Sequence, residues 1–159
     1  MEVRPATMDD CEAIGAGMKV VVDEGIWLAT EEASAAALAR RFQRMIGEGD
    51  TVLVLVDEEE IVGMVDLHPQ TPGVVGLGMW VLPSHRGRGG GRMLLRAAIE
   101  ARPADVHKIG LEVFPENEAA VGLYRSLGFE QEGLLRDHYR RRDGSLRSAL
   151  VMALHLRNA

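Results

Sequence analysis

Residues 79–92 read MWVLPSHRGRGGGR and link a predicted strand to a predicted helix. The segment gathers four glycines, Gly87, Gly89, Gly90 and Gly91, and three arginines, Arg86, Arg88 and Arg92. Glycine leaves backbone N–H groups unhindered, and the first turn of a helix presents the positive end of its dipole. Arginine side chains add charge-assisted donors for phosphate oxygens. The segment therefore predicts a site that holds a phosphate-bearing ligand at the start of a helix.

The spacing of these glycines excludes two common nucleotide-binding loops. The P-loop pattern GxxxxGK[ST] does not occur, and the third glycine of the dinucleotide pattern GxGxxG would fall on Arg92. No strand–helix–strand unit precedes the loop, as a dinucleotide-binding fold requires. A solvated loop without a ligand would not explain why glycines, arginines and a helix start coincide. A pyrophosphate carried without a metal ion is the ligand class that fits.

The composition of the whole chain is that of an ordinary globular domain. Its 159 residues predict one domain over 1–159, with 47% hydrophobic and 26% charged residues. The net charge of −6 argues against nucleic-acid binding. The single cysteine, Cys11, excludes an internal disulfide and is interpreted as a small buried hydrophobe, and the five histidines show no metal-ligand spacing. Neither a signal peptide nor an apolar run of ~20 residues is found, so we expect a soluble cytoplasmic protein without membrane contact.

Hydrophobic periodicity predicts the elements on either side of the loop. Strand patterns occur at 2–6, 51–56, 61–67, 74–82, 108–114 and 148–156, with an extended segment from Phe129. Helical patterns start after Thr7 and Thr30 and cover 93–101 and 118–127. Gly76 and Gly78 inside one strand mark a bulge or the close approach of another backbone. The order of elements predicts an α/β (α+β) fold, a mixed sheet with helices packed on it.

Two motifs in this chain resemble the signatures of the GNAT acetyltransferase superfamily. Residues 79–91 are similar to its acyl-coenzyme A signature, and the core pattern [Q/R]-x-x-G-x-[G/A] is matched by Arg86, Gly89 and Gly91. The second motif is similar to the segment that follows in the superfamily and comprises Leu111-Glu112-Val113, Asn117, Ala120, Leu123-Tyr124 and Gly128-Phe129. The tail, from Glu132 to Met152, also resembles small amino-acid, polyamine and ribosomal-protein N-acetyltransferases. The pattern is closest to bacterial amino-acid and ribosomal-protein alanine N-acetyltransferases.

The resemblance implies both a fold and an activity. It implies a central, mostly antiparallel sheet in which two parallel strands, 74–82 and 108–114, splay apart, flanked by about four helices. It also implies an enzyme that moves an acetyl group from acetyl-CoA, with no metal, to a primary amine by direct attack in a ternary complex. The pantetheine arm would add to the open strand edge as a surrogate strand, at the backbone groups of Met79, Trp80 and Val81. The Val81 N–H would then act as an oxyanion-type donor.

Resemblance also assigns the candidate catalytic residues. Tyr124 matches the general acid proposed for the superfamily, but a phenol near pKa 10 facing a thiol near 8.5 favours a hydrogen bond over full proton transfer. Asn117 serves either as a helix N-cap or as a donor to pantetheine. Glu112 matches the catalytic glutamate proposed for ribosomal-protein alanine acetyltransferases. Asp66 and His68, on one face of a different strand, are the other candidate bases.

The acceptor is less closely defined than the donor. Deprotonating an α-amino group at pH 7 requires only ~1.4 kcal/mol, against ~4.6 kcal/mol for a lysine-like amine. With no conspicuous base in the sequence, we expect a small-molecule amine such as an amino acid, with a protein N-terminus as the alternative. A non-catalytic acyl-CoA sensor is the alternative of another class. The exposed final strands allow a homodimer.

Residues 22–30 and 134–147 are the regions that set acceptor specificity by resemblance. The second region carries the arginines Arg136, Arg140, Arg141, Arg142 and Arg147. They form either a solvated loop or subunit contact, or an anchor for a substrate carboxylate, which arginine binds through two parallel hydrogen bonds.

Overall fold

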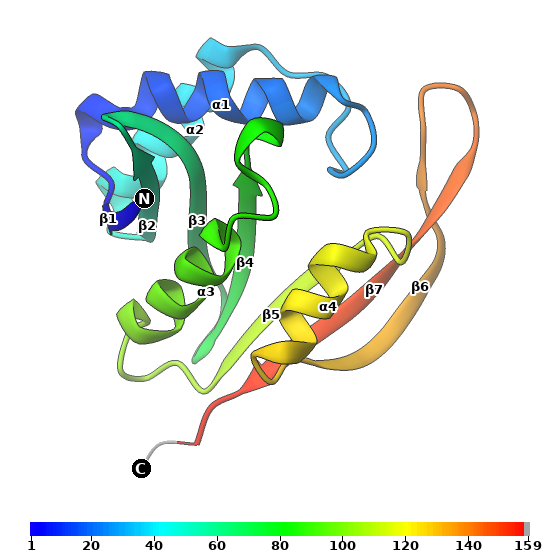
Figure 1. The fold of residues 1–159 in the computed structure, drawn as a ribbon. Coiled ribbons are helices and arrows are strands. Elements are labelled where there is room, and N and C mark those ends of the chain that lie inside the picture. The colour runs from blue at the N-terminus through cyan, green and yellow to red at the C-terminus, as the bar shows by residue number, and fades with distance from the viewer. Residues whose placement is uncertain (158–159) are drawn as a thin grey trace.

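The computed structural model describes residues 1–157 (Figure 1). The strands of this part form one sheet in the order β1-β2-β3-β4-β5-β7-β6. They are β1 Glu2–Pro5, β2 Thr51–Asp57, β3 Glu60–Thr71, β4 Val74–Val81, β5 Lys108–Val113, β6 Glu130–Arg140 and β7 Leu146–His155. All neighbouring strands are antiparallel except β4 and β5, which are parallel. The predicted mixed, mostly antiparallel sheet is confirmed.

Helices cover both faces of the sheet. Figure 1 shows α1 and α2 together against one face, and α3 and α4 on the opposite face. The bounds are α1 Cys11–Asp23, α2 Ala35–Glu48, α3 Gly90–Ala101 and α4 Glu118–Ser126, with short 3-10 turns at η1 Met8–Asp10 and η2 Pro83–His85. The predicted order of elements is therefore confirmed along the described chain.

The alternation of β2 explains its uninterrupted apolar run. Val52 and Val54 belong to the core beneath α1 and α2, which also contains Cys11. Leu53 and Leu55 belong to the core beneath α3 and α4. Because both faces of this strand are covered, every position from 52 to 55 is buried, as expected for a strand enclosed on both sides.

Helix α2 begins later than the capping signal at Thr30 predicted. Its N-cap is Ser34, whose Oγ accepts a hydrogen bond from the backbone of Ala37 at 3.0 Å. The segment between α1 and α2, residues 24–34, is a loop whose carbonyl groups bond to arginines of the β6–β7 hairpin. Residues 30–33 lie outside the helix, and there the Glu31 carboxylate accepts a hydrogen bond from the backbone N–H of Arg142 at 2.9 Å, so the prediction of a helix from Thr30 was wrong at this end.

Gly76 and Gly78 make room for side chains of β3. Pairing of β3 with β4 continues through both glycines without a bulge. A Cβ built on Gly78 would lie 2.7 Å from Oδ2 of Asp66, and one on Gly76 would overlap the ring of His68. The close approach predicted for these glycines is therefore real, but it comes from side chains, not from a backbone.

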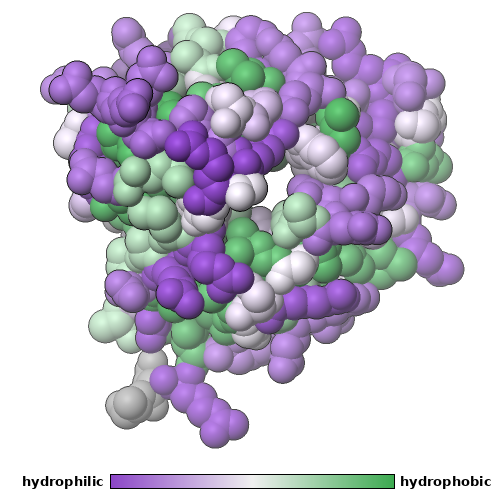
Figure 2. Space-filling view, viewed as in Figure 1, coloured by the Kyte–Doolittle hydropathy of each residue, from purple (hydrophilic) through white to green (hydrophobic). Residues whose placement is uncertain are grey.

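The parallel strands β4 and β5 separate after a short paired region. Their ladder consists of Val74–Lys108, Val75–Ile109 and Gly76–Gly110. Beyond these pairs, residues 77–81 of β4 and 111–113 of β5 have no ladder partner in each other. Figure 2 shows the molecule hollowed between these two parts. The predicted splaying of the parallel strands is confirmed, and it opens a cleft through the middle of the sheet.

Candidate functional site

The glycine-rich loop lies between the end of β4 and the start of α3, at one rim of the cleft (Figure 1). Gly87 and Gly89 have φ values of +73° and +85°, which favour glycine over residues with a Cβ. Gly90 has a different requirement, because a Cβ there would lie 2.5 Å from Cδ2 of Leu55. Gly91 faces the neighbouring helix, where its Cβ would lie 3.2 Å from Cδ2 of Leu123. Gly87 and Gly89 are thus exposed just before the helix N-terminus, which suits a diphosphate, whereas Gly90 is buried.

The three arginines of the loop have partners within the chain. Arg86 donates through Nε to the carbonyl of Val81 at 3.0 Å and through both terminal nitrogens to Glu24. Arg88 lies 3.4 Å from Oδ2 of Asp57. Arg92 Nη2 donates to Oγ of Ser126 at 2.9 Å and so joins α3 to α4.

The guanidinium of Arg86 is therefore already occupied by Glu24 and Val81, although its sequence position matches the loop motif. Diphosphate binding by Arg88 and Arg92 stays a prediction, and so does binding by the loop backbone.

The open edge of β4 carries Met79, Trp80 and Val81. The Trp80 side chain is 4% exposed and packs on α1, where a Cβ added to Gly17 would overlap its ring. Met79 lies on the other face, 3.8 Å from the position of a Cβ on Gly91. Since both side chains are committed to packing, the groups that this edge can offer to a ligand are backbone N–H and C=O groups. That chemistry fits an amide-bearing arm such as pantetheine.

Tyr124 lies on α4 with 7% of its surface exposed, beside the ring of Phe129 at 5.7 Å between centroids. Burial raises the pKa of the Tyr124 phenol to about 12. Transfer of its proton to a thiolate of ordinary pKa, near 8.5, would therefore be uphill by about 5 kcal/mol. The phenol stays protonated at working pH and is suited to donating a hydrogen bond to a developing charge.

Asn117 is the N-cap of α4, and its Oδ1 accepts from the backbone of Ala120 at 3.2 Å. The capping alternative is therefore confirmed. A bond to pantetheine would have to come from Nδ2, and this second role stays a prediction.

Glu112 points to the opposite face of β5 from its neighbours. Leu111 and Val113 turn into the core beneath α3 and α4, whereas Glu112 is exposed. The hydroxyl of Tyr139, on β6, donates a hydrogen bond to Oε2 of Glu112. Both residues line a pocket of about 120 Å³ together with Trp27, Leu28, Ala29, Val113, Phe114 and Ala149.

This pocket brings together the two regions expected to set specificity, the α1–α2 loop and the final hairpin. The sequence interpretation named the regions that contain Trp27 and Tyr139 but neither of these residues, and it missed Phe114. No local pattern singles them out, because they come from a loop, the end of β5 and an irregular part of β6.

Two of the hairpin arginines fasten the α1–α2 loop. Arg141, 6% exposed, donates to the carbonyls of Gly25, Leu28 and Ala29 at 3.1–3.2 Å. Arg147 donates to the carbonyl of Ile26, and its guanidinium lies 3.8 Å from the ring centroid of Phe114.

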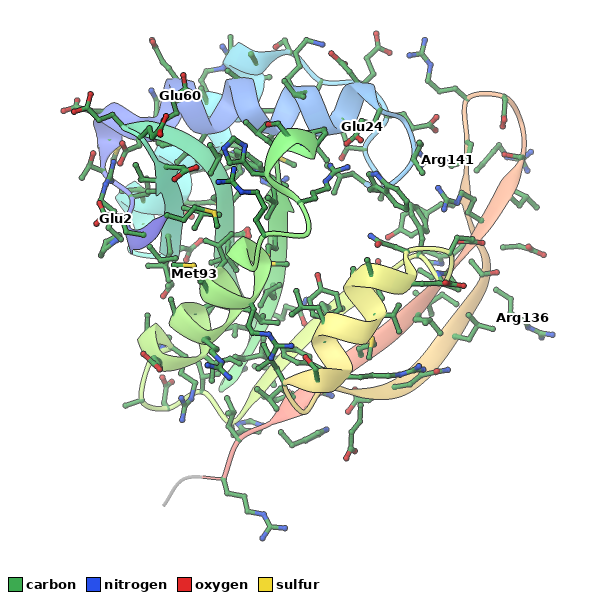
Figure 3. All side chains as sticks on the ribbon, viewed as in Figure 1. Glu2, Glu24, Glu60, Met93, Arg136 and Arg141 are labelled. Atoms are coloured by element: carbon green, nitrogen blue, oxygen red, sulfur yellow. The ribbon has the colours of Figure 1, made fainter. Side chains whose placement is uncertain are left out.

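Figure 3 shows Arg141 directed from the hairpin toward this loop and Arg136 pointing away from it. Arg141 and Arg147 are thus neither solvated nor free to anchor a substrate carboxylate, because they hold the wall of the pocket in place.

Asp66 and His68, the other candidate bases, lie side by side on β3. Asp66 is 1% exposed, and its Oδ2 is 3.5 Å from Nδ1 of His68. Because a base must reach the acceptor amine, the exposed carboxylate of Glu112 in the pocket is better placed than the enclosed Asp66.

A family profile described as "Acetyltransferase (GNAT) family" matches residues 20–129, which include the cleft, the glycine loop and Tyr124. The chain belongs to the GNAT acetyltransferase family. This membership confirms the resemblance on which the predictions of acyltransferase chemistry and of acetyl-CoA as donor depend.

Three known proteins illustrate the similarity. The structure of a ribosomal-protein-alanine N-acetyltransferase from Brucella melitensis superposes with a TM-score of 0.89 at 28% identity, covering 98% of this chain and 100% of that one. A putative acetyltransferase from Salmonella typhimurium, solved with its cofactor acetyl-CoA, has a TM-score of 0.89 at 23% identity over 100% of this chain and 95% of that one, and shows the GNAT fold. The N-alpha-acetyltransferase RimI of Mycobacterium tuberculosis is 47% identical over 58 residues, or 36% of this chain. That match spans about a third (35%) of the length of this curated relative.

Two further findings describe the GNAT chain between residues 1 and 157. None of its helices there is long and apolar enough to cross a membrane. In the same part, no three His, Cys, Asp or Glu side chains are grouped so as to hold a metal ion.

Proposed function

We propose that this GNAT chain transfers the acetyl group of acetyl-CoA to the α-amino group of a peptide N-terminus with a small first residue. One observation carries the proposal. The cleft between β4 and β5 has the glycine-rich loop on its β4 side, and on its β5 side it has α4 with Tyr124 and the small pocket that contains the Glu112 carboxylate (Figure 1). The two substrates would therefore meet within the sheet, as direct transfer in a ternary complex requires.

The pocket favours a peptide over the free amino acid expected from the sequence. A free amino acid carries a carboxylate, which needs a cationic or strong hydrogen-bonding partner when it is bound. The lining residues include no lysine or arginine, and Arg141 and Arg147 are used to hold the α1–α2 loop. A volume of about 120 Å³ suits a small side chain. The name of the similar protein from Brucella melitensis, a ribosomal-protein-alanine N-acetyltransferase, agrees with this substrate class.

On the donor side, the loop backbone from Gly87 to Gly91 would hold the diphosphate, assisted by Arg88 and Arg92. The free edge of β4 at residues 79–81 would bond the pantetheine amides, and the Val81 N–H would receive the acetyl oxygen. Arg86 supports this arrangement indirectly, because it binds the Val81 carbonyl and holds the end of the strand.

On the acceptor side, Glu112 would take the proton of the attacking amine as the new N–C bond forms and the C–S bond breaks. Tyr124 would donate a hydrogen bond to the departing thiolate. An α-ammonium group first releases one proton to solvent to become the neutral amine, which requires only ~1.4 kcal/mol at pH 7. One ionised carboxylate is then sufficient for the second proton, which leaves the nitrogen as the amide forms.

The test is release of the coenzyme A thiol from acetyl-CoA with a panel of acceptors: peptides beginning with alanine, free alanine, spermidine and an aminoglycoside. We expect turnover with the peptides, and a loss of about a hundredfold or more in the Glu112→Gln variant. Faster turnover with free alanine than with the peptides would contradict the peptide assignment. Tight acetyl-CoA binding without turnover on any acceptor would favour the non-catalytic sensor.

A further inference from the structure

The hydrogen bond between Tyr139 and Glu112 joins β6 to β5 across β7. Nothing in the transfer chemistry described above uses Tyr139. We propose that Tyr139 is a positioning residue, whose hydroxyl fixes the orientation of the Glu112 carboxylate through Oε2. This inference rests on the proposed role of Glu112 as the base. Within residues 1–157, Oε2 of Glu112 accepts a hydrogen bond from the protein and Oε1 accepts none, so Oε1 is the oxygen left for the acceptor amine.

An irregularity of β6 brings Tyr139 to this place. Leu135 pairs with Ala149 and Tyr139 pairs with Arg147, so the three residues in between on β6 face only Ser148. An unbroken ladder continued from Leu135 would set Tyr139 opposite Ser145, beyond the start of β7. The bulge therefore moves Tyr139 two residues along β7, toward the part of β7 that pairs with β5, while keeping it on the same face of the sheet.

The bulge itself is held by a specific contact. Asp137, at its centre, has φ of +50°, a conformation that is uncommon for residues other than glycine. Its backbone N–H donates to Oγ of Ser148 at 3.0 Å. A conformation of this kind persists only where the surroundings enforce it, and it is often found next to functional sites.

The ring of Tyr139 is fixed as well as its hydroxyl. It packs edge-on against Phe114, with 5.8 Å between centroids and an interplanar angle of 88°. Burial, and then the hydrogen bond and charge of Glu112, raise the pKa of the Tyr139 phenol to about 12. The phenol is therefore a donor throughout the pH range in which the enzyme works.

Other charged groups around Glu112 are paired with partners of their own. Arg147 and Arg141 lie over Phe114 and bond to the α1–α2 loop, with Glu116 and Glu31 as their acidic partners. On β5 itself Lys108 pairs with Glu132, and on β3 the titratable pair is Asp66 with His68. The residues of the α1–α2 loop that line the pocket, Trp27, Leu28 and Ala29, are uncharged. The ring of His138 packs beside that of Tyr139. Tyr139 is thus the side chain that bonds directly to the carboxylate.

The experiment compares kcat and KM for the intact chain and for Tyr139→Phe, with an alanine-initiated peptide as acceptor. The phenylalanine keeps the ring contact with Phe114 and removes only the donor. We expect kcat to fall by about three- to tenfold, because the carboxylate loses the bond that orients it, while KM for the peptide and the affinity for acetyl-CoA change less than about twofold. His138→Gln, which removes the neighbouring ring, is the control and should leave kcat unchanged.

The same substitution in the Glu112→Gln background separates the possible outcomes. With the carboxylate gone, Tyr139→Phe should change kcat/KM no further. An unchanged kcat in Tyr139→Phe, or a loss that persists in the Glu112→Gln background, overturns the positioning role alone. A Glu112→Gln enzyme with full activity overturns the assignment of the base, and this inference with it. Thermal unfolding of each variant identifies any loss that comes from misfolding.

Discussion

Arg86 and Glu24 form an ion pair with two parallel hydrogen bonds, of 2.8 and 2.6 Å, although 62 residues separate them. Glu24 follows the last residue of α1, and Arg86 opens the glycine-rich loop. Hydrogen bonds from Arg86 are the main cause of the lowered pKa of the Glu24 carboxyl, and the positive charge of Arg86 lowers it further. Since Arg86 also binds the Val81 carbonyl, one side chain connects the donor side of the cleft to the α1–α2 loop.

A double-mutant cycle measures this connection. We expect Glu24→Gln and Arg86→Met to be coupled by about 1 kcal/mol in the free energy of unfolding, since the pair is bidentate but partly exposed. The exposed pair of Lys19 with Asp23, one helical turn apart, is the control and should couple by about 0.3–0.5 kcal/mol. Additive effects of the two substitutions at Glu24 and Arg86 would show that the pair contributes nothing.

Adjacent arginines of the hairpin should differ sharply in importance. Arg141→Met leaves three loop carbonyls without their donor, so we expect unfolding to require about 2–4 kcal/mol less and KM for the acceptor to rise. Arg142→Met removes only a 3.4 Å ion pair with Glu32, in which the side chain of Arg142 is 67% exposed and that of Glu32 is 79% exposed. This substitution should change the free energy of unfolding by less than about 0.5 kcal/mol. Chemical denaturation of both variants checks this, and equal effects would contradict the clamp.

The glycine loop can be tested against a glycine of equal strain elsewhere. Gly89 and Gly49 share a φ of +85°, and a Cβ on either would meet no atom within 4 Å. Valine at either position should destabilise the fold by a similar amount. We expect only Gly89→Val to weaken acetyl-CoA binding, by about tenfold or more (~1.4 kcal/mol) in calorimetry. Unchanged affinity in Gly89→Val would remove the loop from the donor site.

Tyr124→Phe should separate turnover from binding. In the proposed mechanism the buried phenol donates a hydrogen bond to the leaving thiolate, so we expect kcat to fall by about a hundredfold while the Kd of acetyl-CoA changes less than about twofold. Because burial raises the pKa of Tyr124 to about 12, this phenol should produce no loss of activity near pH 10 in the intact chain. An alkaline limb near pH 10 that disappears in Tyr124→Phe would contradict the buried, protonated state.

The stability of the fold should depend on Asp10 at low pH. The pKa of Asp10 is lowered from 3.8 to about 2, mainly by hydrogen bonds from Arg4. A carboxyl with a depressed pKa in the folded state contributes stability that is present above about pH 4 and lost as the pH falls toward 2. We expect Asp10→Asn to lower stability at pH 7 by about 1–2 kcal/mol, since Arg4 is partly exposed, and to flatten the acid side of the curve. Arg4→Met should flatten it in the same way.

The order of elements and the place of the cleft could be predicted from the sequence because their signals are local. The apolar run of β2, the glycine spacing at 87–91 and the αL glycine at position 128 each act within a few residues. The motif around Tyr124 also places it correctly on a helix beside the cleft.

The acceptor side could not be predicted in the same way, because its contacts join distant residues. The carbonyl of Ala29 and the side chain of Arg141 are 112 residues apart, and Tyr139 and Glu112 are 27 apart. No periodicity connects such pairs. The late start of α2 has the same origin, because Glu31, ahead of Ser34, bonds to the backbone N–H of Arg142 in the hairpin.

Only three residue pairs join β4 to β5, so the sheet is two half-sheets attached at one end. The buried cluster under α3 and α4 nevertheless includes Leu77 from the first half and Ile109 and Met152 from the second. The packing of these side chains, more than the three backbone pairs, therefore sets the angle between the two half-sheets. We expect Leu77, Ile109 and Met152 to govern how far the two half-sheets open, although none of these three lines the pocket around Glu112.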